Sequence, residues 1–319
     1  MTLPARIVIT GSSGYLGTAL IRSLADAEAV EEIIGWDRRP PRERPAKLRF
    51  ERADVTDPDL DKRLAALSPD ALVHLAFVLQ PSHDAELMHR INIAGTRNVL
   101  AAAHCAGVGQ ILVASSGTAY GAFPDNPVPL RESDPCRPHP TFQYAQEKAW
   151  LERDYAQYRE EHPEVAFAVL RPCVVYGPGV DNYLAGMLTS LPISVGLKGY
   201  DPPVQFVHEE DVVGVACAVL DQRAEGAFNV APPDTLLTSE TVRRPRRPHL
   251  FLPEWLLGPL VGAAWTLRLP LLHVPTSFLD FVRYPWVLDT TRVREELGYT
   301  YRHSSRETLD IMLAAKGRG

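Results

Sequence analysis

Short apolar, β-branched runs alternate with longer amphipathic stretches over the first half of the chain. The runs predict strands at residues 6–10, 32–36, 48–51, 71–76, 110–115 and 165–170, and helices are expected at 15–27, 92–105 and 144–162. Such alternation is typical of a parallel sheet wound with helices. Its order predicts an α/β, Rossmann-type doubly wound dinucleotide-binding fold.

The pattern loosens after residue 171, where many of the 28 prolines fall. A helix expected at 211–220 and a strand at 227–230 would return the chain to the sheet. We therefore expect a Rossmann domain of residues 1–176 plus about 209–234, and a smaller mixed substrate-binding lobe of 177–208 plus 235–319. The apolar stretch 255–267 falls short of the roughly 20 residues of a membrane span. It is expected to form a helix over a pocket.

Charge and cysteine content narrow the possible partners. A net charge of −6 and a pI near 5.9 argue against nucleic acid or an anionic membrane as the main partner. Four well-separated cysteines predict reduced, mostly buried thiols and no metal site. An apolar run reached by Ile7 leaves no room for a signal peptide. We expect a cytoplasmic protein with a small-molecule substrate, and a homodimer is compatible with these features.

Three glycines lie between the first predicted strand and the first predicted helix. They stand in the segment Gly11-Ser-Ser-Gly14-Tyr15-Leu16-Gly17. A tight turn needs residues that accept positive φ, and a side chain at Gly14 would obstruct a pyrophosphate. The N–H groups of the following helix would bind phosphate charge. This placement predicts a dinucleotide cofactor.

Asp37 follows the second predicted strand, 20 residues after Gly17. Its carboxylate would accept hydrogen bonds from the adenosine ribose and repel a 2′-phosphate, which favours NAD over NADP. Arg38 and Arg39 leave NADP open, because a neighbouring arginine can accommodate the phosphate. The alternative role for Asp37 is that of a turn residue.

Tyr144 and Lys148 are four residues apart and share one face of a predicted helix. A phenol of pKa about 10 is a poor base at neutral pH. A nearby ammonium and a positive nicotinamide ring would lower that pKa into a working range. The spacing alone fits a surface contact equally well.

Ser116 makes this spacing more specific, because it follows the apolar strand that ends near residue 115. A hydroxyl at the carboxyl edge of the sheet lies where doubly wound folds bind ligands. The alternative is a helix cap or turn former. Since residues 123–127 have a loop composition, capping is disfavoured.

Together these residues resemble the extended short-chain dehydrogenase/reductase family, in the branch of NAD-dependent epimerases and dehydratases that includes UDP-glucose/galactose 4-epimerase-like proteins. The resemblance covers about the first 230 residues well. It is carried by Thr10–Gly17, Asp37, Asp54-Val55, His74-Leu75-Ala76, Asn92–Val99, Ser115-Ser116, Tyr120-Gly121, Tyr144–Lys148, Leu170-Arg171-Pro172 and Tyr176-Gly177-Pro178.

The resemblance implies a role for each matching residue. Asp54 and Val55 would contact the adenine, and Leu75, Ala76 and Phe77 would line the cofactor diphosphate and ribose. Tyr144 would be the acid/base, Ser116 its hydrogen-bonding partner, and Lys148 would hold the nicotinamide ribose and depress the tyrosine pKa. Asn92 would support the active site from the neighbouring helix, and the segment from Pro172 to Val174 would position the nicotinamide through backbone groups; all three named residues are counted with the cofactor site. For His74 we expect a satisfied core histidine instead.

Three departures from the family pattern bear on the substrate. Nucleotide-sugar enzymes of this family usually carry asparagine where this chain has Val174, and arginine where it has Gln205. Both groups normally bind a diphosphate, and Arg268, Arg283 and Arg292 are candidates to replace them. The acidic pair of a sugar dehydratase is also replaced, by Gly117-Thr118.

Two enzymatic functions therefore remain open. The one we predict is a nucleotide-sugar epimerase-like enzyme, which transfers hydride at a hydroxyl or carbonyl carbon and recycles a tightly held NAD. The other is a reductase or dehydrogenase of a less polar carbonyl or alcohol, favoured by the apolar stretch 251–281. A nucleotide-sensing regulator is disfavoured, because Ser116, Tyr144 and Lys148 are all present.

Overall fold

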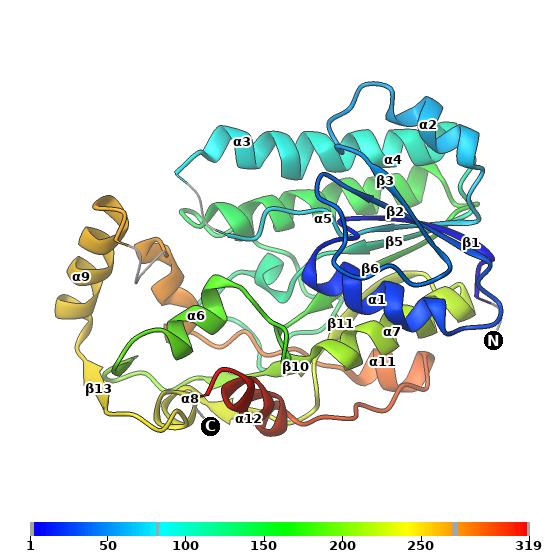
Figure 1. The fold of residues 1–319 in the computed structure, drawn as a ribbon. Helices are drawn as coiled ribbons and strands as arrows, with labels where there is room; N and C mark the ends of the chain where they lie inside the picture. Colours follow the sequence, from blue (N-terminus) through cyan, green and yellow to red (C-terminus); the bar gives the residue numbers. More distant parts are fainter. Residues whose placement is uncertain (1–2, 81–82, 270–273, 318–319) are drawn as a thin grey trace.

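The predicted sheet is present in the computed structural model, which describes residues 3–80, 83–269 and 274–317. Within these residues, seven parallel strands lie in the order β3-β2-β1-β4-β5-β6-β11 (Figure 1). Their bounds are β1 Arg6–Thr10, β2 Glu32–Asp37, β3 Leu48–Arg52, β4 Ala71–His74, β5 Gln110–Ala114, β6 Ala166–Pro172 and β11 Gly226–Val230. The order reverses between β1 and β4, where ligands bind in doubly wound sheets.

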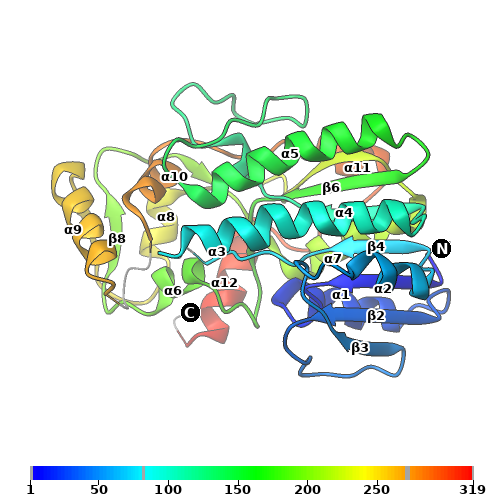
Figure 2. The ribbon, with the colours of Figure 1, turned by 90° about the horizontal axis from the view of Figure 1, so that it is seen from above.

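Helices cover both faces of this sheet, which accounts for the almost continuously buried central strands β1, β4 and β5. Figures 1 and 2 show α1 and α7 on one face and α2, α4 and α5 on the other. Their bounds are α1 Tyr15–Ala25, α7 Glu209–Gln222, α2 Leu60–Leu67, α4 Gly95–Cys105 and α5 Gln143–Glu161. Each face has its own cluster of buried apolar side chains.

The returning strand is confirmed, because β11 pairs in parallel with β6 over five residues. The helix expected at 92–105 is longer than predicted. It is preceded by α3 (Ala85–His89) and a π-helical turn (Arg90–Ala94). The run begins at Asp84, whose carboxylate accepts a hydrogen bond from the Leu87 amide and caps the first turn. The short helix α2 was not predicted.

The C-terminal half contributes short elements beside the sheet. They are β7 Val174–Tyr176, α6 Tyr183–Thr189, β8 Ser194–Leu197, β9 Pro203–Val204, β10 Phe206–His208, β12 Leu236–Leu237, α8 Thr238–Arg243, β13 His249–Leu252, α9 Glu254–Thr266, a 3₁₀ turn Thr276–Leu279, α10 Asp280–Arg283, α11 Thr291–Glu296 and α12 Ser305–Ala315. β7 pairs with β10. The predicted boundary after residue 176 would place β7 in the Rossmann domain and β10 in the substrate-binding lobe, so this strand pair joins the two. The predicted lobe includes residues 270–273, 318 and 319, which lie outside the described residues.

Two further expectations concern membrane-spanning helices and the burial of the cysteines. In the described parts of the chain, no helix is both long and apolar enough to cross a membrane. All four cysteines are free thiols. The expectation that they are mostly buried is wrong, because Cys173 is buried while Cys105 is exposed and the other two are half-buried.

Candidate active site

The glycine loop joins β1 to α1 with no space for side chains. Gly11 has φ +70°, and a Cβ there would lie 2.7 Å from the backbone nitrogen of Ala76. A Cβ on Gly17 would lie 2.3 Å from the carbonyl oxygen of Gly11. The first turn of α1 has no acidic residue, and its N-cap, Gly14, has no side chain to cap it. The loop and the positive end of α1 therefore fit the pyrophosphate of a dinucleotide.

Asp37 ends β2 beside this loop. Its Oδ2 accepts a hydrogen bond from the Ser13 amide at 3.1 Å, and its Oδ1 accepts one from the Arg39 amide at 3.0 Å. These bonds fix the carboxylate at the carboxyl end of the strand, where a ribose would meet it. The Arg38 guanidinium instead lies 3.5 Å from Asp54. That ion pair draws Arg38 toward the next loop.

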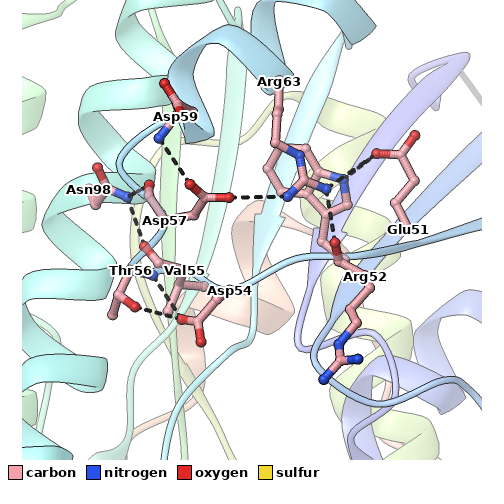
Figure 3. Close-up of polar contacts among 10 residues, drawn as sticks. Glu51, Arg52, Asp54, Val55, Thr56, Asp57, Asp59, Arg63 and Asn98 are labelled. Atoms are coloured by element: carbon pink, nitrogen blue, oxygen red, sulfur yellow. Dashed lines mark hydrogen bonds and ion pairs between the residues drawn. The ribbon is translucent and has the colours of Figure 1, made fainter.

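The loop after β3 carries Asp54 and Val55 (Figure 3). Asp54 accepts hydrogen bonds from the amide and hydroxyl of Thr56 at 3.0 and 2.8 Å. Burial opposes ionisation of this carboxyl, but the bonds from Thr56 and the charge of Arg38 outweigh it and lower its pKa. Asn98 on α4 donates to the Val55 carbonyl at 2.9 Å and anchors the loop (Figure 3).

The segment after β4 contributes Leu75 and Phe77 to the same cavity as the glycine loop. Asn92, which the sequence placed among the cofactor residues, lies behind this cavity and is completely buried. Its side chain binds both backbone groups of Val78 and donates to Glu147 Oε2 at 2.7 Å. The prediction that Asn92 contacts the cofactor directly is therefore wrong, because protein partners occupy its side-chain amide. It ties the β4 loop to α5.

Ser116 lies just past β5 and lines the cavity. It caps a 3₁₀ turn, Gly117–Tyr120, by accepting the Thr118 amide at 3.2 Å. The expectation that Ser116 is not a cap is wrong, because the turn occupies only four residues before the loop composition begins. The Thr118 hydroxyl also donates to Ser116 Oγ at 3.0 Å. Sequence reasoning missed Thr118, which lines the cavity as well.

Tyr144 and Lys148 come from the first turns of α5 and both line the cavity. The Lys148 Nζ donates to the Ala114 carbonyl at 2.8 Å, and it lies 3.4 Å from the centroid of the Phe77 ring. It is 6.0 Å from the centroid of the Tyr144 ring. The structure therefore brings Ser116, Tyr144 and Lys148 to one wall, as the resemblance implies.

Burial controls the protonation of this wall. It raises the pKa of Tyr144 to about 12, against the lowering effect of hydrogen bonds with Ser116 and Thr118. It lowers the pKa of Lys148 to about 7, although Glu152 and Glu147 oppose the shift. The expected depression of the tyrosine pKa by Lys148 is not found, because the loss of solvation dominates.

One cavity of about 460 Å³ runs from the glycine loop, past Tyr144, into the C-terminal elements. Its far walls come from α6, β8, α8, α9 and the segment 274–286. The side chains there are mainly apolar and include Leu184, Met187, Leu188, Leu191, Val195, Leu197, Val204, Phe206, Val242, Leu257, Val261, Val274, Phe278, Leu279, Phe281, Val282 and Trp286. The helix predicted over a pocket is confirmed as α9.

Cations are scarce along this cavity. Among the described lining residues, they are Lys148 and Arg247. Arg247 donates from Nε to Ser194 Oγ at 2.7 Å and from an Nη to the Leu188 carbonyl at 2.6 Å. It also donates to the Leu191 carbonyl. Its guanidinium therefore caps the carbonyl groups at the C-terminal end of α6.

The three arginines proposed to replace the missing diphosphate-binding groups lie outside the cavity lining. Arg283 pairs with Glu254 and Asp280, and Arg292 donates to the carbonyls of residues 225 and 227. Arg268 is exposed just beyond α9. None of the three is a described lining residue of the cavity, so the expected compensation is wrong.

The two positions where the family usually carries asparagine and arginine hold uncharged residues here, Val174 and Gln205. Val174 lines the cavity with an apolar side chain. Gln205 is buried, where it binds the Leu288 amide at 2.7 Å and donates to the Pro232 and Leu288 carbonyls. Its amide therefore joins chain segments and does not face the cavity.

His74 is a core residue, as expected. Thr10 and Thr96 hydrogen-bond its two ring nitrogens at 2.7 and 2.9 Å. Burial lowers its pKa to about 3, so the ring is neutral at physiological pH. Its role is to join β1, β4 and α4 beneath the site.

Comparison with known proteins agrees with the family resemblance seen in the sequence. Residues 7–231 match the model of the NAD dependent epimerase/dehydratase family. An uncharacterized protein of Mycobacterium tuberculosis is 26% identical over 98% of this chain and 85% of its own length. A UDP-glucose 4-epimerase of Mycolicibacterium smegmatis is 31% identical over 56% of this chain and 58% of its own length.

A solved structure has the same fold. It is the UDP-glucose 4-epimerase of Thermus thermophilus in complex with NAD, which superposes with a TM-score of 0.76 at 20% identity. The match covers 98% of this chain and 99% of that one. The similarity therefore extends over the C-terminal elements as well as the sheet.

Proposed function

The chain belongs to the NAD dependent epimerase/dehydratase family, and we propose that it interconverts a hydroxyl and a carbonyl group on a substrate with a large apolar part. The observation that carries this proposal is the single cavity shared by the glycine loop, the Ser116–Tyr144–Lys148 wall and the apolar C-terminal side chains. Nucleotide, acid/base groups and substrate would meet there without rearrangement of the fold.

Each residue of the wall has a distinct task in this proposal. Bound NAD would supply a hydride acceptor or donor. Tyr144 Oη would give a proton to the substrate oxygen during reduction and take it during oxidation. Ser116, supported by Thr118, would hold that oxygen by a hydrogen bond. Lys148 would bind ribose hydroxyls and supply positive charge near the phenol.

Protonation favours the reductive direction in the ligand-free site. With a pKa of about 12, Tyr144 carries its proton at neutral pH and is ready to donate it. Oxidation requires the phenolate, which the positive charge of an oxidised nicotinamide would favour. We therefore expect oxidation to have the higher pH optimum.

The choice of substrate follows from the cavity walls. A nucleotide diphosphate needs cations or several hydrogen-bond donors. The cations among the described lining residues are Lys148, beside the catalytic wall, and Arg247, which already binds protein groups. An aliphatic or aromatic substrate would instead bury its surface against Met187, Val261 and Phe278.

A nucleotide-sugar 4-epimerase is the second candidate. The names of the Mycolicibacterium and Thermus proteins favour it. Native mass spectrometry of the purified protein separates the candidates. An epimerase should retain NAD and interconvert UDP-glucose and UDP-galactose without net redox change. The favoured function predicts cofactor that exchanges freely and NADH consumption with an apolar carbonyl compound. Epimerisation of UDP-glucose would contradict it.

A further inference from the structure

Helix α9 is apolar nearly all round and yet lies largely at the surface. Its sequence, EWLLGPLVGAAWT, has one charged residue, Glu254, in thirteen positions. Only Val261 and Ala264 are buried. Helices that are apolar all round are ordinarily enclosed by protein or lipid. The exposed side of α9 therefore calls for a partner.

The apolar side chains of α9 have two kinds of surroundings. Leu257 and Val261 line the cavity. Trp255 is instead 77% exposed, and Leu260 is 49% exposed. In the neighbouring segments of the chain, Leu250, Leu267 and Leu269 are also each about half exposed or more. In both views α9 forms one end of the molecule (Figures 1 and 2).

The segment that contains α9 is basic in a protein that is otherwise acidic. Residues 243–269 hold Arg243, Arg244, Arg246, Arg247 and Arg268 against Glu254 alone, a net charge of +4. Since the whole chain carries −6, the remainder carries −10. Some of these charges already have partners. Arg244 pairs with Asp310, and Glu254 pairs with Arg283. Arg247 donates a hydrogen bond to Ser194 at the cavity.

The outward-facing charge is therefore positive. Arg243, Arg246 and Arg268 are exposed; the first two precede β13 in the chain, and the third directly follows α9. Exposed apolar side chains together with arginines match the surface of an anionic bilayer, in which basic residues meet lipid phosphates and a tryptophan lies at the interface. A second copy of this chain would offer the same positive charge, so the charge argues against self-association here.

We propose that α9, with β13 and the segment 243–248, docks this protein on an anionic lipid surface. A helix of 13 residues lies in the plane of the interface, because a span needs roughly 20. The overall charge of −6 argues against an anionic membrane only when it is averaged over the molecule. Docking would place one wall of the apolar cavity at the lipid, a consequence that rests on the proposed function; the docking itself does not.

Sedimentation of the full-length chain with vesicles tests this proposal without substrate or cofactor. Vesicles of phosphatidylcholine alone are compared with vesicles that also contain phosphatidylglycerol. Binding should require the anionic lipid and weaken with added salt. The double variant Trp255→Ser/Leu260→Ser should reduce the partition coefficient at least about tenfold. The charge variant Arg246→Glu/Arg268→Glu should remove the preference for anionic lipid.

Matched controls separate the surface from general effects. Leu87→Ser removes an exposed apolar side chain on α3, and Arg42→Glu/Arg44→Glu makes the same charge change on a distant loop. Both should bind as the wild type does, and circular dichroism should show all variants folded. Absence of vesicle binding, or equal binding by the α9 variants, would overturn the proposal. A dimer that dissociates in Trp255→Ser/Leu260→Ser, without vesicle binding, would assign the surface to a second copy instead.

Discussion

Lys148 is a buried cation whose charge should destabilise the ligand-free protein. Burial lowers its pKa from the ordinary 10.5 to about 7. At pH 6 the folded protein holds the proton at a cost of about 5 kcal/mol, from 1.36 kcal/mol for each unit of the shift. At pH 9 the folded form has lost the proton while the unfolded form keeps it. The cost is then about 2 kcal/mol.

Lys148→Met removes this charge and keeps most of the side-chain volume. The variant loses one hydrogen bond, to the Ala114 carbonyl, which is worth about 1 kcal/mol. The free energy of unfolding should therefore rise by about 4 kcal/mol at pH 6 and by about 1 kcal/mol at pH 9. The sign follows because the wild type gains stability, relative to the variant, as pH rises from about 7 toward 10.5.

Urea unfolding at the two pH values, followed by tryptophan fluorescence, measures the difference. Lys198→Met, at an exposed lysine, should show no such dependence on pH. The more stable Lys148→Met protein should nevertheless have lost turnover, as expected where a functional group is held at a cost in stability. A variant that is destabilised equally at both pH values would refute this account of the site.

Three other variants test separate parts of the site. Gly17→Ala should weaken NAD binding at least about tenfold in a fluorescence titration, because its Cβ would meet the Gly11 carbonyl; unchanged affinity would contradict the tight loop. Asp37→Ala should reduce the preference for NAD over NADP, and titration of both cofactors would show an unaltered ratio if the carboxylate has no such role. Asn92→Leu should lower the unfolding free energy by about 1–3 kcal/mol, because Glu147 loses a buried donor; urea unfolding that matches the wild type would argue against this link.

The cofactor half of the molecule could be predicted because its signals are local. Strand, glycine turn and helix follow one another within residues 6–25, and the acid/base pair lies within one helical turn. In such segments the side-chain positions follow from the backbone period. Asn92 and Ser116 were harder, since their hydrogen-bond partners depend on how loops pack.

The substrate half could be predicted only as apolar. Its walls come from segments between residues 174 and 286, and no periodicity relates them. Arg247 and the three arginines expected to bind a diphosphate show the difficulty. Their charge is visible in the sequence, but tertiary packing decides that Arg247 lines the cavity while Arg283 and Arg292 bind carboxylates and carbonyls elsewhere.

The central claim is that Tyr144 performs acid/base chemistry beside an apolar substrate pocket. The most direct test is kcat/KM for NADH-dependent reduction of ketones with increasing alkyl chain length, in wild type and Tyr144→Phe. We expect kcat/KM to rise about fourfold for each added methylene until the cavity is filled. We also expect a loss of about 10²–10⁴-fold in the variant, with NAD affinity preserved. Equal turnover by Tyr144→Phe, or no dependence on chain length, would contradict it.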